Sequence, residues 1–340
     1  MSQNPEEVYC TICGMLLDRD CIVLSGPHWP QDNARTVSDK EVTRYTAITQ
    51  SCYGEIHILP DNEQIYPQQT TDENHDHIGD GAPAKMYHGI HPACEDLANR
   101  VIKTSPNAKI SGIGDLFLTL ERRCASYQWS TLEQRLGPRD NNYVPPIFNE
   151  EKNALTCDGY YVPRNCIDQW GDEWAGWWDE NPVNIPDLTT RLISNLEKAP
   201  QSSSSHHLQK SMEATPNEIN DHIRNFVQGP FPLECTYIMP QSQWAEIFFH
   251  IPFLWDLDME TIYEKVGGSN KEDLEKWNWE KLTRQIMSPV PPMVDVDEED
   301  EWDHSQVGLD VPGGLTNRRR IWQVLEEMRP ETELREAHDR

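Results

Sequence analysis

Two short motifs hold the residues of this sequence that are best suited to bind a metal ion. One is the Cys-x-x-Cys turn of Cys10 and Cys13, and the other is the His-x-x-Cys pair of His91 and Cys94. Such a turn points two thiolates toward one place, and a third sulfur with one imidazole nitrogen would complete the tetrahedral ligand set of zinc. Because four protein ligands fill that coordination sphere, the motifs predict a structural rather than a catalytic zinc ion.

Other interpretations of these residues remain open at the level of sequence. The two motifs are far apart in the chain, so their residues can also be unrelated, with Cys10 and Cys13 as reduced thiols of a core. A thioredoxin-like redox role for this pair is less favoured, because no βαβ pattern surrounds it. If the zinc site recruits other ligands, the reserves are Cys21, Cys52, His57 and His88.

The charge balance restricts the classes of partner. The 340 residues contain 29 Lys and Arg against 57 Asp and Glu, a formal net charge of -28. A surface this negative repels the phosphates of nucleic acids and of anionic membranes, so neither is an expected partner. The sequence has no apolar run long enough to span a membrane and no secretory signal, which predicts a cytoplasmic or nuclear protein. Its 9 cysteines are therefore expected to be thiols or metal ligands rather than disulfides.

The first half of the chain is predicted to contain both strands and helices. β-branched and aromatic residues over 45–53 and 55–59 indicate two strands or a hairpin. Helical patterns follow over 87–103 and 110–136, and the second carries an apolar face of Ile113, Leu116, Phe117 and Leu120. Residues 138–185 are irregular and rich in Trp, and their indoles are expected to pack against neighbouring elements.

The second half is predicted to be mainly helical. A short amphipathic helix has Pro186 in its first turn and carries Leu188, Leu192, Ile193 and Leu196. A further helical segment covers 270–290, and a last helix covers 315–328. The three arginines at 318–320 are too few to indicate a nuclear import signal, and they are expected to balance local acidic charge.

These patterns predict an α+β fold that is mostly α. It comprises a small N-terminal β/α unit stabilised by zinc, an irregular Trp-rich middle, a three-helix unit and C-terminal helices. The Ser-rich segment 199–210 and the acidic segment 289–310 are expected to be the most mobile interior parts of the chain. The predicted boundaries, in chain order, are 1–105, 106–198, a linker at 199–211, 212–260, and 261–340 with its acidic loop.

Residues 212–260 contain an ordered series of apolar anchors. Pro216 fits the first turn of a helix whose single apolar face consists of Ile219, Ile223, Phe226 and Val227. A Pro-rich turn over 229–232 follows, and two more short segments carry Trp244 and Trp255. The same pattern also fits an ordinary three-helix piece of a larger helical core.

This segment resembles an F-box, whose pattern is a Leu-Pro start, a helix with Ile and Leu anchors, a Trp in the middle and a terminal Leu-Trp. The matching residues are Pro216, Glu218, Ile219, Ile223, Val227, Trp244 and Trp255. Thr215 stands where the family usually has Leu, and Pro240 stands where a small residue usually precedes the Trp. The resemblance implies docking on the Skp adaptor through Pro216, Ile219, Ile223, Val227, Trp244 and Trp255.

The whole chain also resembles a group of fungal F-box-like proteins. These proteins combine a Cys-x-x-Cys, a His-x-x-Cys, an Asn-Ile-Pro-Asp-Leu-Thr stretch and a closing Asn-Arg-Arg-Arg-Ile-Trp. In this sequence the four motifs lie at 10–13, 91–94, 184–189 and 317–322. The resemblance implies an F-box-like fold and indicates no particular substrate.

Three functions compete on this basis. The first is a substrate-recruiting subunit of an SCF-type cullin-RING ubiquitin ligase, which would dock on the Skp adaptor, assemble with a cullin and select a protein substrate. The second is a non-enzymatic, zinc-stabilised scaffold or protein-binding module with no ligase role. The third, a metal-dependent enzyme, has no catalytic motif in its favour. Solvent exposure of Ile223, Val227 and Trp244 would separate the first two.

Overall fold

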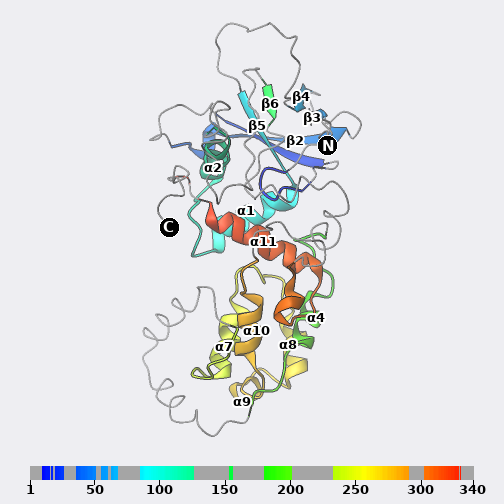
Figure 1. Ribbon diagram of the computed structural model, residues 1–340, viewed down its shortest axis with the longest axis vertical. Coiled ribbons are helices and arrows are strands. Elements are labelled where there is room, and N and C mark those ends of the chain that lie inside the picture. Colours follow the sequence, from blue (N-terminus) through cyan, green and yellow to red (C-terminus); the bar gives the residue numbers. More distant parts are fainter. Residues whose placement is uncertain are drawn as a thin grey trace. The chain divides into compact units, whose positions relative to one another are not determined.

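The structure is a computed structural model, and its chain divides into two compact units that are described separately below. Unit 1 comprises Met1–Asp179, Pro292–Asp300 and Ile321–Arg340, and unit 2 comprises Glu180–Pro291 and Glu301–Arg320. Helices and strands both occur (Figure 1), which agrees with the α+β prediction. The described residues are 10–15, 17, 20–26, 36–50, 55–59, 63–67, 85–125, 153–155, 180–200, 233–290, 302–328 and 330.

The strands of unit 1 form a closed barrel with the order β1-β2-β3-β4-β6-β5. In chain order they are β1 (Asp20–Ser25), β2 (Thr43–Gln50), β3 (Glu55–Leu59), β4 (Glu63–Pro67), β5 (Lys85–Ile90) and β6 (Asn153–Leu155). The predicted hairpin is confirmed, because β2 and β3 pair antiparallel from Gln50 and Glu55 onward. Strand β1 also pairs antiparallel with β5, and β6 runs parallel to both β4 and β5.

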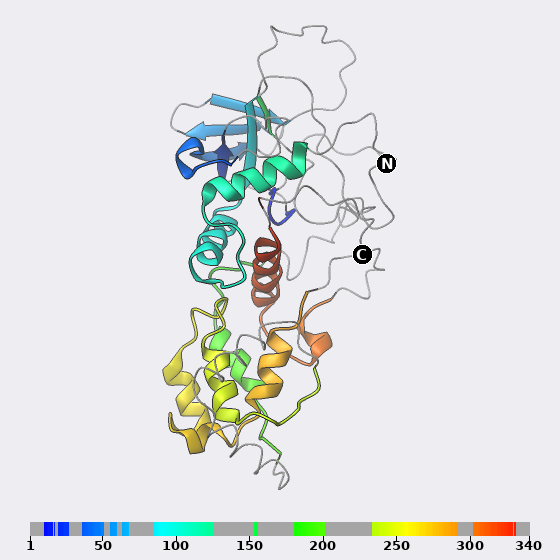
Figure 2. The ribbon, with the colours of Figure 1, turned by 90° about the vertical axis from the view of Figure 1, so that its left-hand side faces the viewer.

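Two helices of unit 1 lie next to these strands (Figure 2). They are α1 (Pro92–Thr104) and α2 (Ile113–Ala125), and a 3-10 turn, η1 (Asp39–Glu41), precedes β2. The helical prediction over 87–103 is wrong at its start, because residues 87–90 belong to β5 and pair with β1. Pro92 then occupies the first position of α1, where its missing N–H is not needed. The apolar face predicted for α2 is buried through Leu116, Phe117 and Leu120.

Unit 2 is helical in its described residues. Its elements are α4 (Leu188–Ser194), α7 (Gln241–Phe249), α8 (Met259–Val266), α9 (Lys271–Leu274), α10 (Trp279–Ile286), the 3-10 turn η7 (His304–Val307) and the first part of α11 (Gly313–Glu327), up to Arg320. Helices α7 and α10 lie side by side (Figure 1). Between them the rings of Phe248 and Trp279 stand 5.4 Å apart, and both side chains are buried.

Two segments were expected to be irregular and mobile, and the structure describes only parts of them. The segment 289–310 was expected to be mobile, and within it residues 302–310 form η7 and bury His304 and Leu309; its mobility stays a prediction. Residues 201–210 of the predicted linker lie outside the described residues, as does the Trp-rich stretch before Glu180. Among the described helices, none combines the length and the apolar character that crossing a membrane requires.

Candidate metal centre

The Cys-x-x-Cys motif folds as a tight turn. The backbone N–H of Gly14 donates to the carbonyl of Cys10 at 2.8 Å, and the N–H of Cys10 donates to the carbonyl of Met15 at 2.8 Å. Gly14 has a φ of 78°, a left-handed conformation that glycine adopts at little cost. The turn therefore brings both cysteine side chains to one side of a short, closed loop.

Backbone pairing places this turn beside the end of β5. The N–H of Thr11 donates to the carbonyl of Gly89 at 2.9 Å, and its hydroxyl donates to the same oxygen at 3.2 Å. Gly89 is two positions before His91, so the contact sets the distance between the two motifs. Cys10 and Cys13 are buried there, together with Ile12.

The second motif occupies the junction between β5 and α1. His91 directly follows the strand and is the N-cap residue of α1, and Cys94 lies in the first turn of that helix. Backbone N–H groups at a helix N-terminus lack partners within the helix and carry a partial positive charge. This end of α1 therefore attracts negative charge, although hydrogen bonds to Cys10 and Cys13 raise the pKa of the Cys94 thiol itself.

The four side chains converge to distances that suit a single metal ion. The Sγ atoms of Cys10 and Cys94 are 3.7 Å apart, and Sγ of Cys13 lies 3.4 Å from Nδ1 of His91. Tetrahedral bonds of about 2.3 Å to sulfur and about 2.0 Å to nitrogen give edges of about 3.8 Å and about 3.5 Å. All four ligand atoms lie within 4.8 Å of one another, so the set can hold a metal ion, although its widest separation exceeds these ideal edges.

The pKa values of the cluster are shifted by the interactions between its own side chains. Burial by itself raises the pKa of the Cys13 thiol, but hydrogen bonds from Cys10 and Cys94 and the charge of His91 outweigh it and hold that pKa well below its ordinary value. Burial lowers the pKa of His91, yet the negative charges of Cys13 and Cys10 raise it to about 12. Hydrogen bonds to Cys10 and Cys13 raise the pKa of Cys94 well above its ordinary value. The protons held by this cluster are those that a bound metal ion would displace.

The two reserve ligands whose side chains the structure describes, Cys21 and His88, do not join the cluster. Cys21 is buried on β1, and burial, followed by the negative charges of Cys10 and Asp20, raises its pKa to about 12, so its thiol stays neutral. His88 is buried with its ring edge-on to Phe117 at 5.4 Å. Cys52 and the side chain of His57 lie outside the described residues.

Two of the residues predicted to contact the Skp adaptor lie within the described part of the chain, and the adaptor contact itself stays a prediction. Trp244 is only 2% exposed, and the guanidinium of Arg284 lies 5.1 Å from its ring centroid. Trp255 is half-buried under the guanidinium of Arg318, at 3.9 Å. The Trp244 indole therefore packs inside unit 2, whereas the Trp255 indole is partly exposed. The remaining predicted contacts lie outside the described residues, and they are Pro216, Ile219, Ile223 and Val227.

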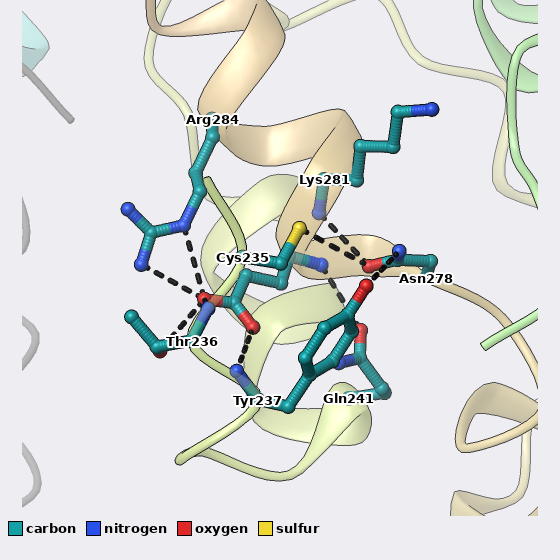
Figure 3. A network of polar contacts seen from close by, with 8 residues as sticks. Cys235, Thr236, Tyr237, Gln241, Asn278, Lys281 and Arg284 are labelled. Atoms are coloured by element: carbon teal, nitrogen blue, oxygen red, sulfur yellow. Dashed lines mark hydrogen bonds and ion pairs between the residues drawn. The ribbon is translucent and has the colours of Figure 1, made fainter. Parts of the chain in front are cut away.

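A buried carboxylate that the sequence analysis missed organises the segment before α7 (Figure 3). Glu280 is fully buried and accepts hydrogen bonds from the N–H of Thr236 at 2.7 Å and the N–H of Tyr237 at 2.8 Å. Arg284, one turn further along α10, donates to the same carboxylate at 2.8 Å. The only sequence signal was the Glu-Arg pair at i and i+4, which also occurs on ordinary exposed helices.

A second buried charge connects three segments of unit 2. Arg318 on α11 has no exposed surface, and it donates to the carbonyls of Pro182 at 2.6 Å and Phe253 at 3.0 Å. Its guanidinium also forms a bidentate ion pair with Asp256, with both distances 2.7 Å. The expectation that this arginine balances acidic charge agrees with the pair. Its burial, shared by Arg319 and Arg320, leaves no exposed basic cluster at 318–320 for an import receptor.

Comparisons with known proteins give no relatives. No family model matches the chain, and no curated protein or solved structure is significantly similar to it.

Proposed function

We propose that this protein is a non-enzymatic, zinc-stabilised scaffold or protein-binding module. The observation that carries the proposal is the convergence of Cys10, Cys13, His91 and Cys94 within 4.8 Å in the described structure. Zinc would join the N-terminal turn to the start of α1, and so fasten the chain before β1 to the chain after β5. Its role would be to stabilise unit 1 rather than to act on a substrate.

The donor set favours zinc over other metal ions. Thiolates are soft ligands that suit Zn²⁺, whereas Mg²⁺ and Ca²⁺ select carboxylate and carbonyl oxygens. Three sulfurs and one imidazole nitrogen are a common composition of structural zinc sites. The four protein ligands would leave no position for water or substrate, and such a position is what catalytic zinc sites keep open.

Metal analysis of the purified full-length protein tests this proposal. We expect about one equivalent of zinc per chain, and a loss of most of it in Cys13→Ser. Cys235→Ser is the matched control, because Cys235 is a half-buried thiol of unit 2 and should leave the zinc content unchanged. Iron in place of zinc, or full zinc content in Cys13→Ser, would contradict the proposal.

The ligase-subunit function is the second candidate, and it depends on residues outside the described part of the chain. In an F-box some anchors hold the helices together while others contact the adaptor, and the burial of Trp244 and Trp255 fits the first group. The contact would then fall to Ile219, Ile223 and Val227. A docked apolar side chain contributes about 1 to 3 kcal/mol, so Ile223→Asp should weaken adaptor binding about tenfold or more.

A calorimetric titration with the purified Skp adaptor tests this second candidate. Wild-type protein should bind, Ile223→Asp and Val227→Asp should bind more weakly, and Glu218→Gln should behave like wild type. Absence of binding by the wild-type protein at tens of micromolar would exclude the ligase role and leave the scaffold role.

A further inference from the structure

Two cysteines of the metal centre lie close enough to form a covalent bond with each other. The Sγ atoms of Cys10 and Cys94 are 3.7 Å apart, and both side chains are buried. The S–S bond of a disulfide is about 2.05 Å long, so the two atoms would have to approach by about 1.7 Å. Small rotations of both side chains about their Cα–Cβ bonds can supply a movement of this size.

The surroundings favour this pair over the other sulfur atoms nearby. Cys13 also belongs to the centre, but its Sγ atom contacts Nδ1 of His91 at 3.4 Å. A disulfide of Cys13 would disrupt this contact, whereas a disulfide between Cys10 and Cys94 leaves it intact. Cys21 is buried on β1 and lies outside the group of side chains that could hold the metal ion.

Backbone contacts keep the pair together without the help of a metal ion. Thr11, the neighbour of Cys10, donates both its N–H and its hydroxyl to the carbonyl of Gly89, at 2.9 and 3.2 Å. Strand β5 continues from Gly89 into the start of α1, where Cys94 lies. The positions of both cysteines therefore depend on the same contact, and their sulfur atoms should stay close when no ion is bound.

A bond between these two residues would connect the same parts of the chain as the metal ion. Cys10 lies in the turn before β1, and Cys94 lies 84 positions later, in the first turn of α1. A bond between Cys10 and Cys13 would instead stay within the turn and leave it unattached to the helix. The bond from Cys10 to Cys94 would therefore take over the structural role of the ion.

A small neutral oxidant suits the burial of these sulfur atoms. Cys10 and Cys94 are 0% and 1% exposed, whereas His91 beside them is only half-buried and leaves the centre open to a small molecule. Hydrogen peroxide is small and uncharged, and it oxidises thiolates, which is the form of cysteine that binds a metal ion.

We propose that hydrogen peroxide converts Cys10 and Cys94 from metal ligands into a reversible disulfide. One thiolate attacks an oxygen of the peroxide, which forms an S–O bond, breaks the O–O bond and releases hydroxide. The other thiolate attacks the same sulfur, which forms the S–S bond and expels a second hydroxide. The two sulfurs together lose two electrons, the two peroxide oxygens gain them, and two protons from solvent convert the hydroxides to water.

The reaction would exchange one crosslink of unit 1 for another. Zinc would keep only Cys13 and His91 as ligands and would leave the site, and cellular thiols would restore the reduced centre by exchange with the disulfide. Transient, redox-sensing disulfides of this kind occur in reducing compartments. The release of zinc rests on the proposed function, whereas the S–S bond itself requires no bound ion.

Peptide mapping by mass spectrometry, before and after hydrogen peroxide is added to the full-length protein, tests the bond. We expect a peptide pair linked through Cys10 and Cys94, release of most of the bound zinc, and recovery of both thiols with dithiothreitol. Cys21→Ser, which removes a buried thiol outside the centre, is the matched control and should form the same link. The oxidised, metal-free protein should keep the slow amide exchange of β1 and α1 that the reduced, metal-free protein loses.

Several results would overturn the proposal. A link between Cys10 and Cys13 would do so, and so would sulfinic or sulfonic acids at Cys10 and Cys94 without a link between them. Loss of amide protection in β1 and α1 to the same extent in the oxidised and the reduced metal-free protein would refute the exchange of crosslinks. Protein that contains zinc but does not form the link contradicts this inference alone. Protein that forms the link but never contains zinc supports the inference and contradicts the proposed function.

Discussion

Unit 1 and unit 2 connect distant parts of the chain by different chemistry. In unit 1 the turn at Cys10 meets the start of α1 through thiol and imidazole side chains that can hold a metal ion. In unit 2 the corresponding connections are buried charges, with Glu280 binding two backbone amides and Arg318 binding two carbonyls and Asp256. With a metal ion bound, the first connection would include a component from solution, whereas the second is complete within the chain.

This difference has a practical consequence for stability. A metal site contributes its binding free energy to folding, so the stability of unit 1 should depend on metal concentration and on chelators. Buried ion pairs contribute little net stability when intact, but the loss of one partner leaves a charge without compensation in a buried site. Chelation should therefore lower the stability of unit 1 alone, and loss of a buried charge should lower the stability of unit 2 alone.

Removal of the metal should have the largest effect. Structural zinc in small domains is worth about 10 to 16 kcal/mol near neutral pH, which equals or exceeds the stability of a typical domain. We expect a strong zinc chelator, or Cys13→Ser, to abolish slow hydrogen exchange in β1 and α1. The amides of α10 should keep their protection under the same conditions. Equal loss of amide protection in both units would show that the stability of unit 1 is not the only one that depends on the metal ion.

Removal of one buried charge in unit 2 should rank second. Glu280→Gln keeps the shape of the side chain but leaves Arg284 without its carboxylate partner, which should cost about 3 to 5 kcal/mol. Exposed Glu272→Gln is the matched control and should change stability by less than about 0.5 kcal/mol. Urea unfolding followed by α10 amide exchange measures both. A Glu280→Gln protein as stable as the control would remove the central role assigned to this carboxylate.

Acid should destabilise unit 2 through His304. Burial, followed by the charge of Arg319, lowers the pKa of this imidazole to about 4. The unfolded chain takes up the proton near pH 6.5, so the stabilisation is complete above that pH and is lost as the pH falls toward 4, by up to about 3 kcal/mol. His304→Gln should remove this part of the pH dependence, measured by urea unfolding between pH 7 and about 4. An unchanged pH profile in that variant would assign the acid sensitivity to other groups.

The smallest effect should come from an exposed ion pair of unit 2. Lys281 and Glu197 are 2.5 Å apart, but their side chains are 37% and 59% exposed. Water and salt screen such pairs, so Glu197→Gln should cost no more than about 0.5 kcal/mol, and raising the salt concentration should reduce even that. A cost comparable to that of Glu280→Gln would mean that burial is not what separates the two pairs.

The four residues that could hold a metal ion were identified from the sequence because their residue types are informative. Thiols and imidazoles are the ligands that zinc prefers, and the two-residue spacing within each motif restricts where their side chains can point. What the sequence left open was whether the motifs meet. Whether the motifs meet depends on the backbone hydrogen bond between Thr11 and Gly89. These residues are far apart in the sequence, and no local pattern predicts their contact.

The buried carboxylate in unit 2 could not be predicted for the opposite reason. With 57 acidic residues in the chain, nothing in the sequence distinguishes Glu280 from the others. Its partners are backbone amides of an irregular segment, and they become visible only when α10 and residues 236–237 are placed together. The error over 87–90 has a related cause, because this short stretch becomes a strand through its pairing with β1 and not through its own pattern.

The position of the metal ligands along the chain also bears on how unit 1 folds. Cys10 and Cys94 are 84 positions apart, and strands β1 to β5 all lie between them. The entropy lost on closing a loop grows slowly with its length, while the time needed to find such distant contacts rises steeply. A metal ion at this site would act as a reversible crosslink that closes a loop of the chain, and this loop contains strands β1 to β5. The folding rate of unit 1 should therefore rise with the concentration of the ion, whereas a unit built from contacts near in sequence would gain little.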